Sequence, residues 1–323
     1  MKEHIVGKEH AGLRLDVFLH AQYLDFSRAW IQKLISKGNV SVNPAPARKG
    51  GTSGKITPSY KLRYGDVVEF TIELPPEISL EPDKSLKDKI EIIFENADLL
   101  IINKPSGVSV HPSSSETKGT IVNWLIYHFP KIKSVGDSLE NGNIRPGIVH
   151  RLDKGTSGVM VIAKNQKTFL MLKKQFQAHT VTKKYSVLVN GTPKEDSGKI
   201  DLNIARSKTD PTKNVATKSK TEGRYALTYW KVVKKYPDHT LLEAAPKTGR
   251  MHQIRVHLKS IGLPVSGDKK YGIKGKDPKH LGRMFLHAEY LSFENSNGEK
   301  MSFSAPLPSD LANCLRNLIY VIK

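Results

Sequence analysis

The chain has 323 residues, which suits two domains, because domains typically run about 100–200 residues. Hydrophobic residues make up 38% of it and no apolar run approaches the roughly 18 residues of a membrane span, so wholesale disorder and a membrane-spanning protein are both excluded. The single cysteine excludes an internal disulfide framework and a cysteine-based zinc site, and the net charge of +20 favours a polyanionic partner.

The first 75 residues have the pattern of a small module of helices and strands. Four apolar residues predict a short first helix: Leu13, Leu15, Phe18 and Leu19. A second helix is expected between Ser27, a typical N-cap, and Gly38, a typical stop. Strands are expected at Val40–Val42 and Val67–Ile72, and a basic loop over 44–59 lies between them.

A stretch without periodicity follows this module. Residues 73–88 contain three prolines and read as a linker. The sequence therefore predicts a small module over 1–75, a linker over 76–88 and a larger domain over 89–323.

The first half of the larger domain mixes strands and helices. A hairpin is expected from the strands Ile90–Phe94 and Leu99–Asn103. The continuous apolar run Gly158–Ala163 predicts a buried strand, and a helix is expected over Gln166–Phe176. The alternation in Val181–Val189 predicts a strand with one shared face: Val181, Lys183, Tyr185, Val187 and Val189.

The second half continues in the same manner. Residues Arg250–Ile261 predict an amphipathic helix with an apolar stripe of Met251, Ile254, Leu258 and Ile261. A hairpin is expected from Phe285–Phe293 and Lys300–Ser304, and a last helix begins at Ser309 with three leucines inward: Leu311, Leu315 and Leu318. Since the strands come in hairpins more than in regular strand–helix alternation, the pattern favours an α+β fold.

The basic residues are concentrated in three runs without an acid. Eight bases lie between Ser27 and Gly65, eight lysines lie over 154–194, and four bases lie over 244–267. A single run of this kind is often a solvated face, but three in one chain favour contact with phosphates. No basic amphipathic helix or lipidation signal indicates a membrane surface. An N-terminus without the apolar stretch of a signal peptide favours a cytoplasmic protein.

One acidic residue stands apart among these bases. Asp153 is the only acid between Glu140 and Glu195, it is flanked by Arg151 and Lys154, and it precedes a buried strand. A carboxylate among cations stays ionised and can act as a nucleophile or a base, although a structural salt bridge has the same spacing. Glycine-rich phosphate loops and the usual hydrolase motifs are absent. No metal site is expected, because the four histidines of interest lack metal-ligand spacing: His150, His252, His257 and His287.

Around Asp153 the sequence becomes recognisable. The segment HRLDKGTSG, residues 150–158, resembles the catalytic motif of the RluA-type pseudouridine synthases. Further segments that resemble this family are NKPSGVSVH (103–111), KKYSV (183–187), KTGRMHQIRVH (247–257), PVSGDKKYG (264–272) and FLHA (285–288). Residues 12–70 resemble the S-four RNA-binding module. The resemblance implies a mixed, mostly antiparallel central β-sheet flanked by helices, plus a small N-terminal α/β RNA-binding module.

The resemblance also implies roles for single residues. Asp153 would be the essential carboxylate, Tyr185 would stack on the target base, and Arg255 would pair with Asp153. Substrate contacts would come from Arg151, which would fill the stack when the target nucleotide is flipped, and from His150, Leu286, Lys104 and Arg250. In the N-terminal module, the RNA-binding residues would be Arg28, Lys33, Lys37, Arg48 and Lys49. The family pattern is broken at two places that do not touch the expected chemistry: Met251 and the pair Asn295-Ser296.

The expected activity is the conversion of uridine to pseudouridine in structured RNA, without metal or organic cofactor. Asp153 could attack the anomeric carbon, attack the uracil ring or remove a sugar proton, and the sequence does not choose between these routes. Large-subunit ribosomal RNA is the favoured substrate, and transfer RNA is the alternative. A non-catalytic RNA-binding assembly factor and an enzyme that releases the base are the competing functions. A monomer with no membrane partner is expected.

Overall fold

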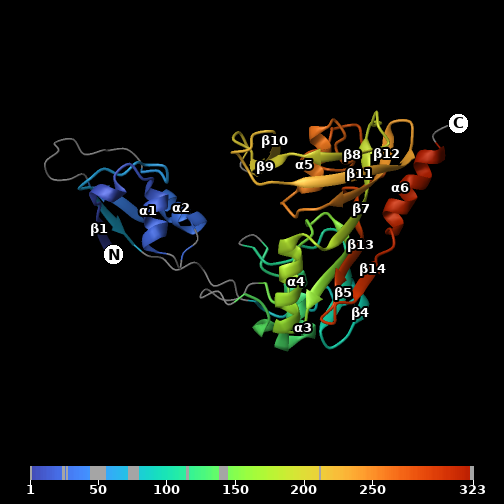
Figure 1. The fold of residues 1–323 in the computed structure, drawn as a ribbon, viewed down its shortest axis with the longest axis horizontal. Coiled ribbons are helices and arrows are strands. Elements are labelled where there is room, and N and C mark those ends of the chain that lie inside the picture. Colours follow the sequence, from blue (N-terminus) through green and yellow to red (C-terminus); the bar gives the residue numbers. More distant parts are fainter. Residues whose placement is uncertain are drawn as a thin grey trace. The chain divides into compact units, whose positions relative to one another are not determined.

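The computed structural model describes residues 2–23, 26, 28–43, 56–71, 80–113, 116–137, 145–210 and 212–320. The chain divides into two compact units, with the boundary between Glu77 and Ile78 (Figure 1). Each unit is described by itself. No helix in the described part of the chain has the length and apolarity needed to cross a membrane.

The N-terminal unit is a three-stranded antiparallel sheet with two helices. Strands β1 (Lys2–Ile5), β3 (Val67–Phe70) and β2 (Val40–Asn43) pair in that order. The helices α1 (Leu15–Gln22) and α2 (Arg28–Lys37) cover the sheet through a core that includes Phe18, Ile31, Leu34, Val68 and Phe70, and the short helix η1 (Lys8–His10) precedes them. The two predicted helices and both strands are confirmed, and β1 was not expected. The proposed Ser27 cap and residues 44–55 of the basic loop lie outside the described residues.

The large unit is built on a nine-stranded sheet. Its strand order is β4-β5-β6-β13-β7-β12-β11-β8, with β14 beside β13. These strands span Glu91–Glu95 (β4), Leu99–Lys104 (β5), Ser157–Ala163 (β6), Thr182–Asn190 (β7), Ser197–Asp201 (β8), Leu227–Lys235 (β11), His239–Pro246 (β12), Leu286–Glu294 (β13) and Lys300–Ser304 (β14). Among the described strands of the sheet, only β6 and β13 pair in parallel, so the predicted mixed, mostly antiparallel sheet is confirmed. A separate two-stranded hairpin joins β9 (Asn203–Arg206) and β10 (Asn214–Thr217).

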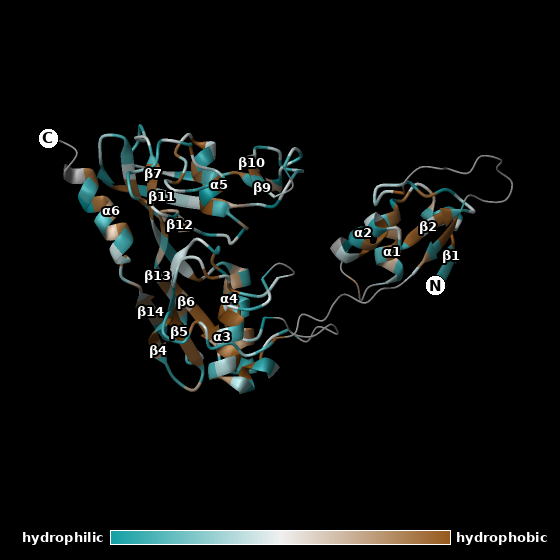
Figure 2. Cartoon of the chain, turned by 180° about the vertical axis from the view of Figure 1, so that it is seen from behind, coloured by the Kyte–Doolittle hydropathy of each residue, from teal (hydrophilic) through white to brown (hydrophobic). Residues whose placement is uncertain are grey.

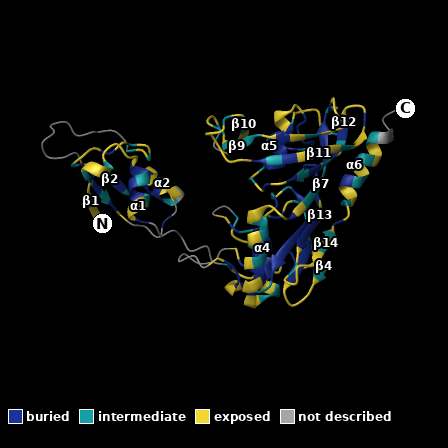
Figure 3. Cartoon of the chain, in the orientation of Figure 1, coloured by how far each residue is buried: buried dark blue, intermediate teal, exposed yellow. Residues whose placement is uncertain are grey.

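Two apolar cores lie on the two halves of this sheet (Figures 2 and 3). Helices α3 (Ile121–His128) and α4 (Gln166–Ala178), with the short helix η2 (Pro130–Ser134), complete the core on β5 and β6. Helix α5 (Gln253–Ser260) completes the core on β7 and β12, and α6 (Ser309–Tyr320) covers a smaller cluster. Strand β13 contributes Leu291 and Phe293 to the first core and Leu286 to the second. The two halves therefore meet where β6, β13 and β7 lie side by side.

Helix α5 differs from its prediction. It begins at Gln253, because His252 has a left-handed backbone with φ 59°. Met251 and Ile261, expected in the apolar stripe, are 47% and 41% exposed. Ile254 and Leu258 are buried as expected, but so are Val256 and the polar His257, since α5 is covered on more than one side by the sheet and by β10.

The expected linker is also partly structured. Leu86 is buried in the first core, and the Asp83 carboxylate accepts a hydrogen bond from the Gly119 amide at 2.8 Å. The Asn123 side-chain amide donates to the Glu81 carbonyl at 2.9 Å. Residues 80–88 therefore belong to the large unit. Their sequence has no periodicity because they form an irregular segment, which hydrogen bonds from α3 and from the residues before α3 hold in place.

Candidate active site

Asp153 lies in the loop that leads into β6, where the two halves of the sheet meet. The loop turns sharply, since the Thr156 amide donates to the Asp153 carbonyl at 3.0 Å. Two further hydrogen bonds join it to the segment after β5: the Gly107 amide donates to the Lys154 carbonyl at 2.8 Å, and the Ser106 hydroxyl donates to the Gly155 carbonyl at 2.9 Å. These contacts fix the backbone on both sides of the carboxylate.

The contact of β6 with β13 explains a glycine in the motif. Gly158 has φ 120°, and a Cβ placed there would lie 2.2 Å from the Ala288 carbonyl oxygen. No other residue allows this approach without moving the backbone. Gly158 therefore permits the parallel pairing that places the Asp153 loop beside β13.

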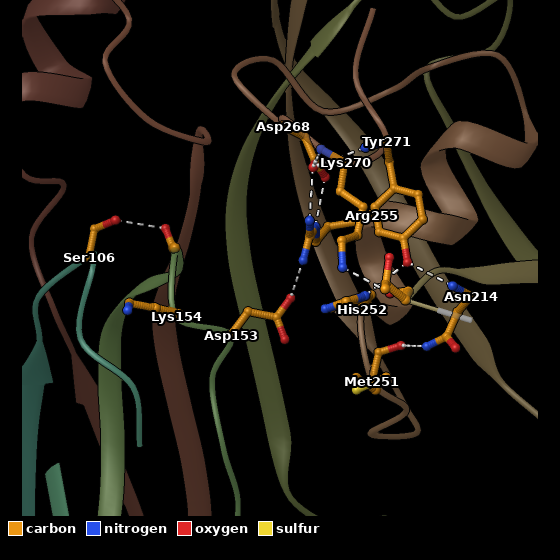
Figure 4. A network of polar contacts seen from close by, with 12 residues as sticks. Ser106, Asp153, Lys154, Asn214, Met251, His252, Arg255, Asp268, Lys270 and Tyr271 are labelled. Atoms are coloured by element: carbon orange, nitrogen blue, oxygen red, sulfur yellow. Dashed lines mark hydrogen bonds and ion pairs between the residues drawn. The ribbon is translucent and has the colours of Figure 1, made fainter. Parts of the chain in front are cut away.

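The Asp153 carboxylate is held by one arginine of α5. Arg255 Nη1 donates to Asp153 Oδ2 at 2.9 Å (Figure 4). The remaining nitrogens of the same guanidinium bind Asp268, with Nε–Oδ2 at 2.7 Å and Nη2–Oδ1 at 2.8 Å. We call this group of Arg255 with its two carboxylates, Asp153 and Asp268, the fork. The other carboxylate oxygen of Asp153, Oδ1, accepts no hydrogen bond from the residues that the structure describes. The expected pairing of Arg255 with Asp153 is thus present, and one oxygen is left for a substrate.

Asp268 is the functional candidate that the sequence interpretation missed. Burial would raise the pKa of its carboxyl, but the hydrogen bonds and charge of Arg255, with the amides of Lys270 and Tyr271, outweigh burial and lower it. Burial would lower the pKa of Arg255, whereas Asp268 and Asp153 raise it, so the guanidinium stays charged. The available signal was its position, because Asp268 ends the acid-free run over 244–267 and lies inside a segment that resembles the family.

Tyr271 and His252 extend this network on the side of the β9–β10 hairpin. The Arg255 guanidinium lies over the Tyr271 ring at 4.9 Å from the centroid. The Tyr271 hydroxyl accepts from the Asn214 amide at 2.9 Å and is hydrogen-bonded to His252 Nδ1 at 2.8 Å. These contacts fix Arg255 on the face opposite Asp153 (Figure 4).

Tyr185 lies on β7 beside the same carboxylate. Its ring packs against the second apolar core, and its hydroxyl makes no hydrogen bond with any described residue. Burial raises the pKa of this phenol, and the negative charge of Asp153 raises it further. Tyr185 is therefore a neutral phenol at physiological pH and has a hydroxyl available to a substrate.

Three of the expected substrate contacts have surroundings that fit the expectation. Arg151 is exposed, and its Nη1 lies 3.3 Å from His111 Nε2. Burial and the nearby Arg151 and Arg145 lower the pKa of His111 to about 4, so the imidazole is neutral beside the arginine. Leu286 packs in the same apolar cluster as Tyr185, and Arg250 lies half-buried with its Nε donating to the Tyr225 carbonyl at 2.9 Å.

Lys104 and His150 hold the site rather than face it. Lys104 is 0% exposed and its ammonium donates to the carbonyls of Pro105 and Val108 at 2.8 and 2.7 Å. Burial lowers its pKa to about 7, although the charge of Asp153 opposes this. His150 Nε2 accepts from the Val161 amide at 3.0 Å, and its ring stacks on Phe176. Burial and Lys183 lower its pKa to about 3. We therefore correct the expected substrate contacts of Lys104 and His150 to scaffold roles.

Three of the five expected RNA-binding residues, Arg28, Lys33 and Lys37, lie in α2 of the N-terminal unit. Arg28 Nε donates to Asp16, a buried acid of α1, at 3.0 Å, so part of its charge is used within the unit. Burial would raise the pKa of Asp16, but hydrogen bonds from Arg14, Gln32 and Arg28 lower it to about 2. Lys33 lies over the Trp30 ring at 5.1 Å, and Lys37 ends the helix. Arg48 and Lys49 lie outside the described residues.

Asp268→Asn is expected to destabilise the large unit by about 3–5 kcal/mol, because it leaves a nearly buried arginine with one carboxylate. Asp310→Asn is the matched control: Arg283 also binds Asp310 through Nε and Nη2, at 2.6 and 3.2 Å, but that carboxylate is 57% exposed. The control should cost at most about 1 kcal/mol. Urea unfolding of both variants measures the difference, and equal losses would contradict the buried fork.

Comparisons with known proteins identify the family of the chain. The sequence profile of the family described as RNA pseudouridylate synthase matches residues 98–260, and the S4 domain profile matches residues 13–52. An RNA pseudouridine synthase of Aquifex aeolicus, described as uncharacterized, is 43% identical over 304 residues, which cover 91% of this chain and 90% of that protein. Ribosomal large subunit pseudouridine synthase D of Zymomonas mobilis is 35% identical over 315 residues, which cover 94% of this chain and 93% of that protein.

Solved structures give the same answer. Human RNA pseudouridylate synthase domain containing 1 is 25% identical with a TM-score of 0.57, and it matches 77% of this chain and 97% of its own. Human RNA pseudouridylate synthase domain containing 4 is 26% identical with a TM-score of 0.55, and it matches 71% of this chain and 93% of its own. Sequence and fold lead to one conclusion: the chain belongs to the RNA pseudouridylate synthase family.

Proposed function

We propose that Asp153 is the essential catalytic group of this RNA pseudouridine synthase, and that its substrate is a uridine of large-subunit ribosomal RNA. The observation that carries the catalytic assignment is the one-sided hold on the carboxylate. Arg255 binds Oδ2, no described residue donates a hydrogen bond to Oδ1, and the phenol of Tyr185 lies on the neighbouring strand. A carboxylate held in this way stays ionised and has an oxygen available for reaction.

The reaction is an isomerisation, so the product has the atoms of the substrate. The bond from the ribose C1′ to N1 of uracil breaks, the base rotates, and C1′ joins C5, whose proton is then lost while N1 regains one. The free oxygen of Asp153 can attack C1′, attack the ring or take a sugar proton. All three routes need an ionised carboxylate at a fixed position, which the Arg255–Asp268 fork provides.

Tyr185 supplies the face against which the base lies. A phenol whose pKa is raised by burial and by Asp153 keeps its proton at neutral pH. It can therefore stack on a uracil and also donate a hydrogen bond or a proton to the rotating base. A phenylalanine ring can stack but has no hydroxyl to donate.

Two variants separate these contributions of Tyr185. Tyr185→Phe is expected to slow single-turnover conversion while leaving RNA binding nearly unchanged, because the ring still stacks. Tyr185→Ala is expected to lose binding as well, since stacking on a base contributes about 1–3 kcal/mol. Quench-flow rates and filter-binding constants for both variants test this. Near-normal rates for both would place Tyr185 in the apolar core only.

The choice of ribosomal RNA rests on the similarity to proteins that carry the name ribosomal large subunit pseudouridine synthase D, 34–35% identical over more than nine-tenths of this chain. Carbodiimide sequencing of total RNA from cells that lack the gene tests it directly. We expect one or more pseudouridines to disappear from large-subunit ribosomal RNA and to return with the wild-type gene. If pseudouridines disappear from transfer RNA instead, the substrate assignment is wrong and the assignment as a pseudouridine synthase stands.

The same sites decide between catalysis and the competing functions. In cells that lack the gene, the Asp153→Asn variant is expected to restore growth if the protein acts only as an RNA-binding assembly factor. If the protein is an isomerase, the same variant should not restore the modification. Mass spectrometry of treated RNA separates isomerisation, which leaves the mass unchanged, from release of the base, which lowers it.

A further inference from the structure

A group of cations surrounds the entry to β7, two residues before Tyr185. Lys183 donates from Nζ to the carbonyl of Thr248 at 3.2 Å, which places its ammonium against the turn between β12 and α5. The same turn carries Lys247 and Arg250. Arg224 lies next to Tyr225, whose carbonyl accepts from Arg250. These four side chains come from three separate segments and gather at one place.

No carboxylate of the described residues neutralises this group. Among the described residues, Lys183, Lys247, Arg250 and Arg224 make no ion pair with an acid. The other cations of the large unit frequently do, as with Lys184 and Lys231, which both pair with Glu243. Like charges that are gathered without a partner raise the free energy of the folded protein, so a binding anion is the natural complement.

The electrostatics of the group agree with this geometry. Burial and Lys247 lower the pKa of Lys183 to about 8, and burial and Arg224 lower the pKa of Arg250. Burial lowers the pKa of His179 at the end of α4, and the charges of Lys183 and Arg250 lower it further. Three basic groups therefore lie near Lys183: Lys247 from the turn, His150 from the Asp153 loop and His179 from α4.

Hydrogen bonds hold the backbone of the turn that carries Lys247 and Arg250. Thr248 is buried, its hydroxyl donates to Gln253 Oε1 at 2.7 Å, and the Arg250 amide donates to the same oxygen at 3.0 Å. The Gln253 side-chain amide donates in turn to the Leu227 carbonyl at 3.0 Å. This network preorganises the turn before any ligand binds.

Lys183 also has a fixed relation to the catalytic centre. On β7, residues 183 and 185 share a face, and two residues of a strand span about 6.7 Å. A nucleotide whose base stacks on Tyr185 would therefore have its own backbone close to the Lys183 ammonium.

We propose that Lys183, Lys247 and Arg250 form a phosphate subsite, which binds the phosphodiester next to the target uridine and so sets the base against Tyr185. The inference rests on the proposed function of Asp153 and Tyr185 and assigns the contact that fixes the register of the strand. Phosphate contacts position a nucleic acid without reading its sequence, which suits a site beside the reacting base.

The first test is the titration of Lys183 in the full chain, labelled with [ε-¹³C]lysine and followed by NMR. Inorganic phosphate and uridine 3′- and 5′-monophosphate are expected to raise the Lys183 pKa from about 8 toward the ordinary lysine value, whereas uridine alone should not. Lys183→Met assigns the resonance. A titration that none of the phosphates moves would overturn the subsite. This readout needs no turnover, so it is independent of the catalytic role of Asp153.

The second test uses ribosomal RNA transcript. Lys183→Met is expected to raise KM and to reduce the slope of log affinity against log salt by about 0.7–0.9, as for one lost phosphate contact. Wild-type affinity should fall as pH rises through about 8, since Lys183 loses its charge there, and Lys183→Arg should abolish this fall. Lys199→Met, an exposed lysine of edge strand β8, is the control and should change neither quantity. A wild-type slope in Lys183→Met would show that free phosphate alone binds there, and would overturn the RNA subsite.

Discussion

Asp153→Asn should abolish turnover and leave RNA affinity nearly unchanged. The substitution keeps the shape of the side chain, and the amide oxygen can still accept the hydrogen bond from Arg255 Nη1, now at 2.9 Å. The variant loses the charge that the free oxygen needs to act as a nucleophile or base, so the rate should fall by at least about a hundredfold. Binding rests on the basic surfaces, which the substitution does not touch.

The measurement is single-turnover conversion at saturating RNA, beside a binding curve for each protein. Glu116→Gln is the matched control, because Glu116 is also a carboxylate near this loop and pairs with Lys154 at 2.8 Å. The control should retain most of the wild-type rate. Retention of more than a few per cent of activity in Asp153→Asn would overturn the assignment, and an equal loss in both variants would indicate general damage to the loop.

Much of the fold follows from the sequence because the local signals agree with the final structure. The continuous apolar run before Ala163 forms the fully buried strand β6, and the alternation around Tyr185 forms β7 with Lys183 and Tyr185 on one face. Gly38 ends α2 with φ 89°, as its sequence position predicts. In each case the side-chain period, the turn residue and the burial all favour one conformation.

The errors occur where tertiary contacts decide. Met251 fits a helical stripe by spacing, but His252 has a left-handed backbone, so the helix begins only at Gln253 and Met251 lies exposed before it. Leu86 lies in a stretch without period, yet it fills a core that other segments create. Sequence spacing cannot report such contacts, since they depend on residues that lie far away along the chain.

The candidate site shows the same division. The role that we propose for Asp153 was predicted from its isolation among bases and from the family motif. The second acid of the fork could not be expected, because Asp268 lies 115 positions further along the chain, and only folding brings both acids to Arg255. For Lys104 the resemblance implied a substrate contact, whereas its ammonium binds backbone carbonyls inside the protein.

The boundary between the two units indicates where the chain can be truncated. The N-terminal unit has its own core, and the boundary lies after Glu77. A protein that begins at residue 78 keeps Leu86 and the hydrogen bond to Asp83, and we expect it to fold. A protein that begins at residue 89 loses both and should unfold at lower urea concentration, which makes it the matched comparison.

The truncated protein of residues 78–323 is expected to bind RNA more weakly than the full chain and with a flatter salt dependence. The N-terminal unit has eight bases and no acid between Ser27 and Gly65, and each lost phosphate contact lowers the slope by about 0.7–0.9. The fork of Asp153, Arg255 and Asp268 lies wholly in the large unit, so the single-turnover rate at saturating RNA should be largely kept. Binding at several salt concentrations, together with single-turnover rates, tests both expectations. If the truncated protein folds and binds like the full chain while its saturated rate collapses, the N-terminal unit takes part in the chemical step, and affinity and catalysis are not divided between the two units.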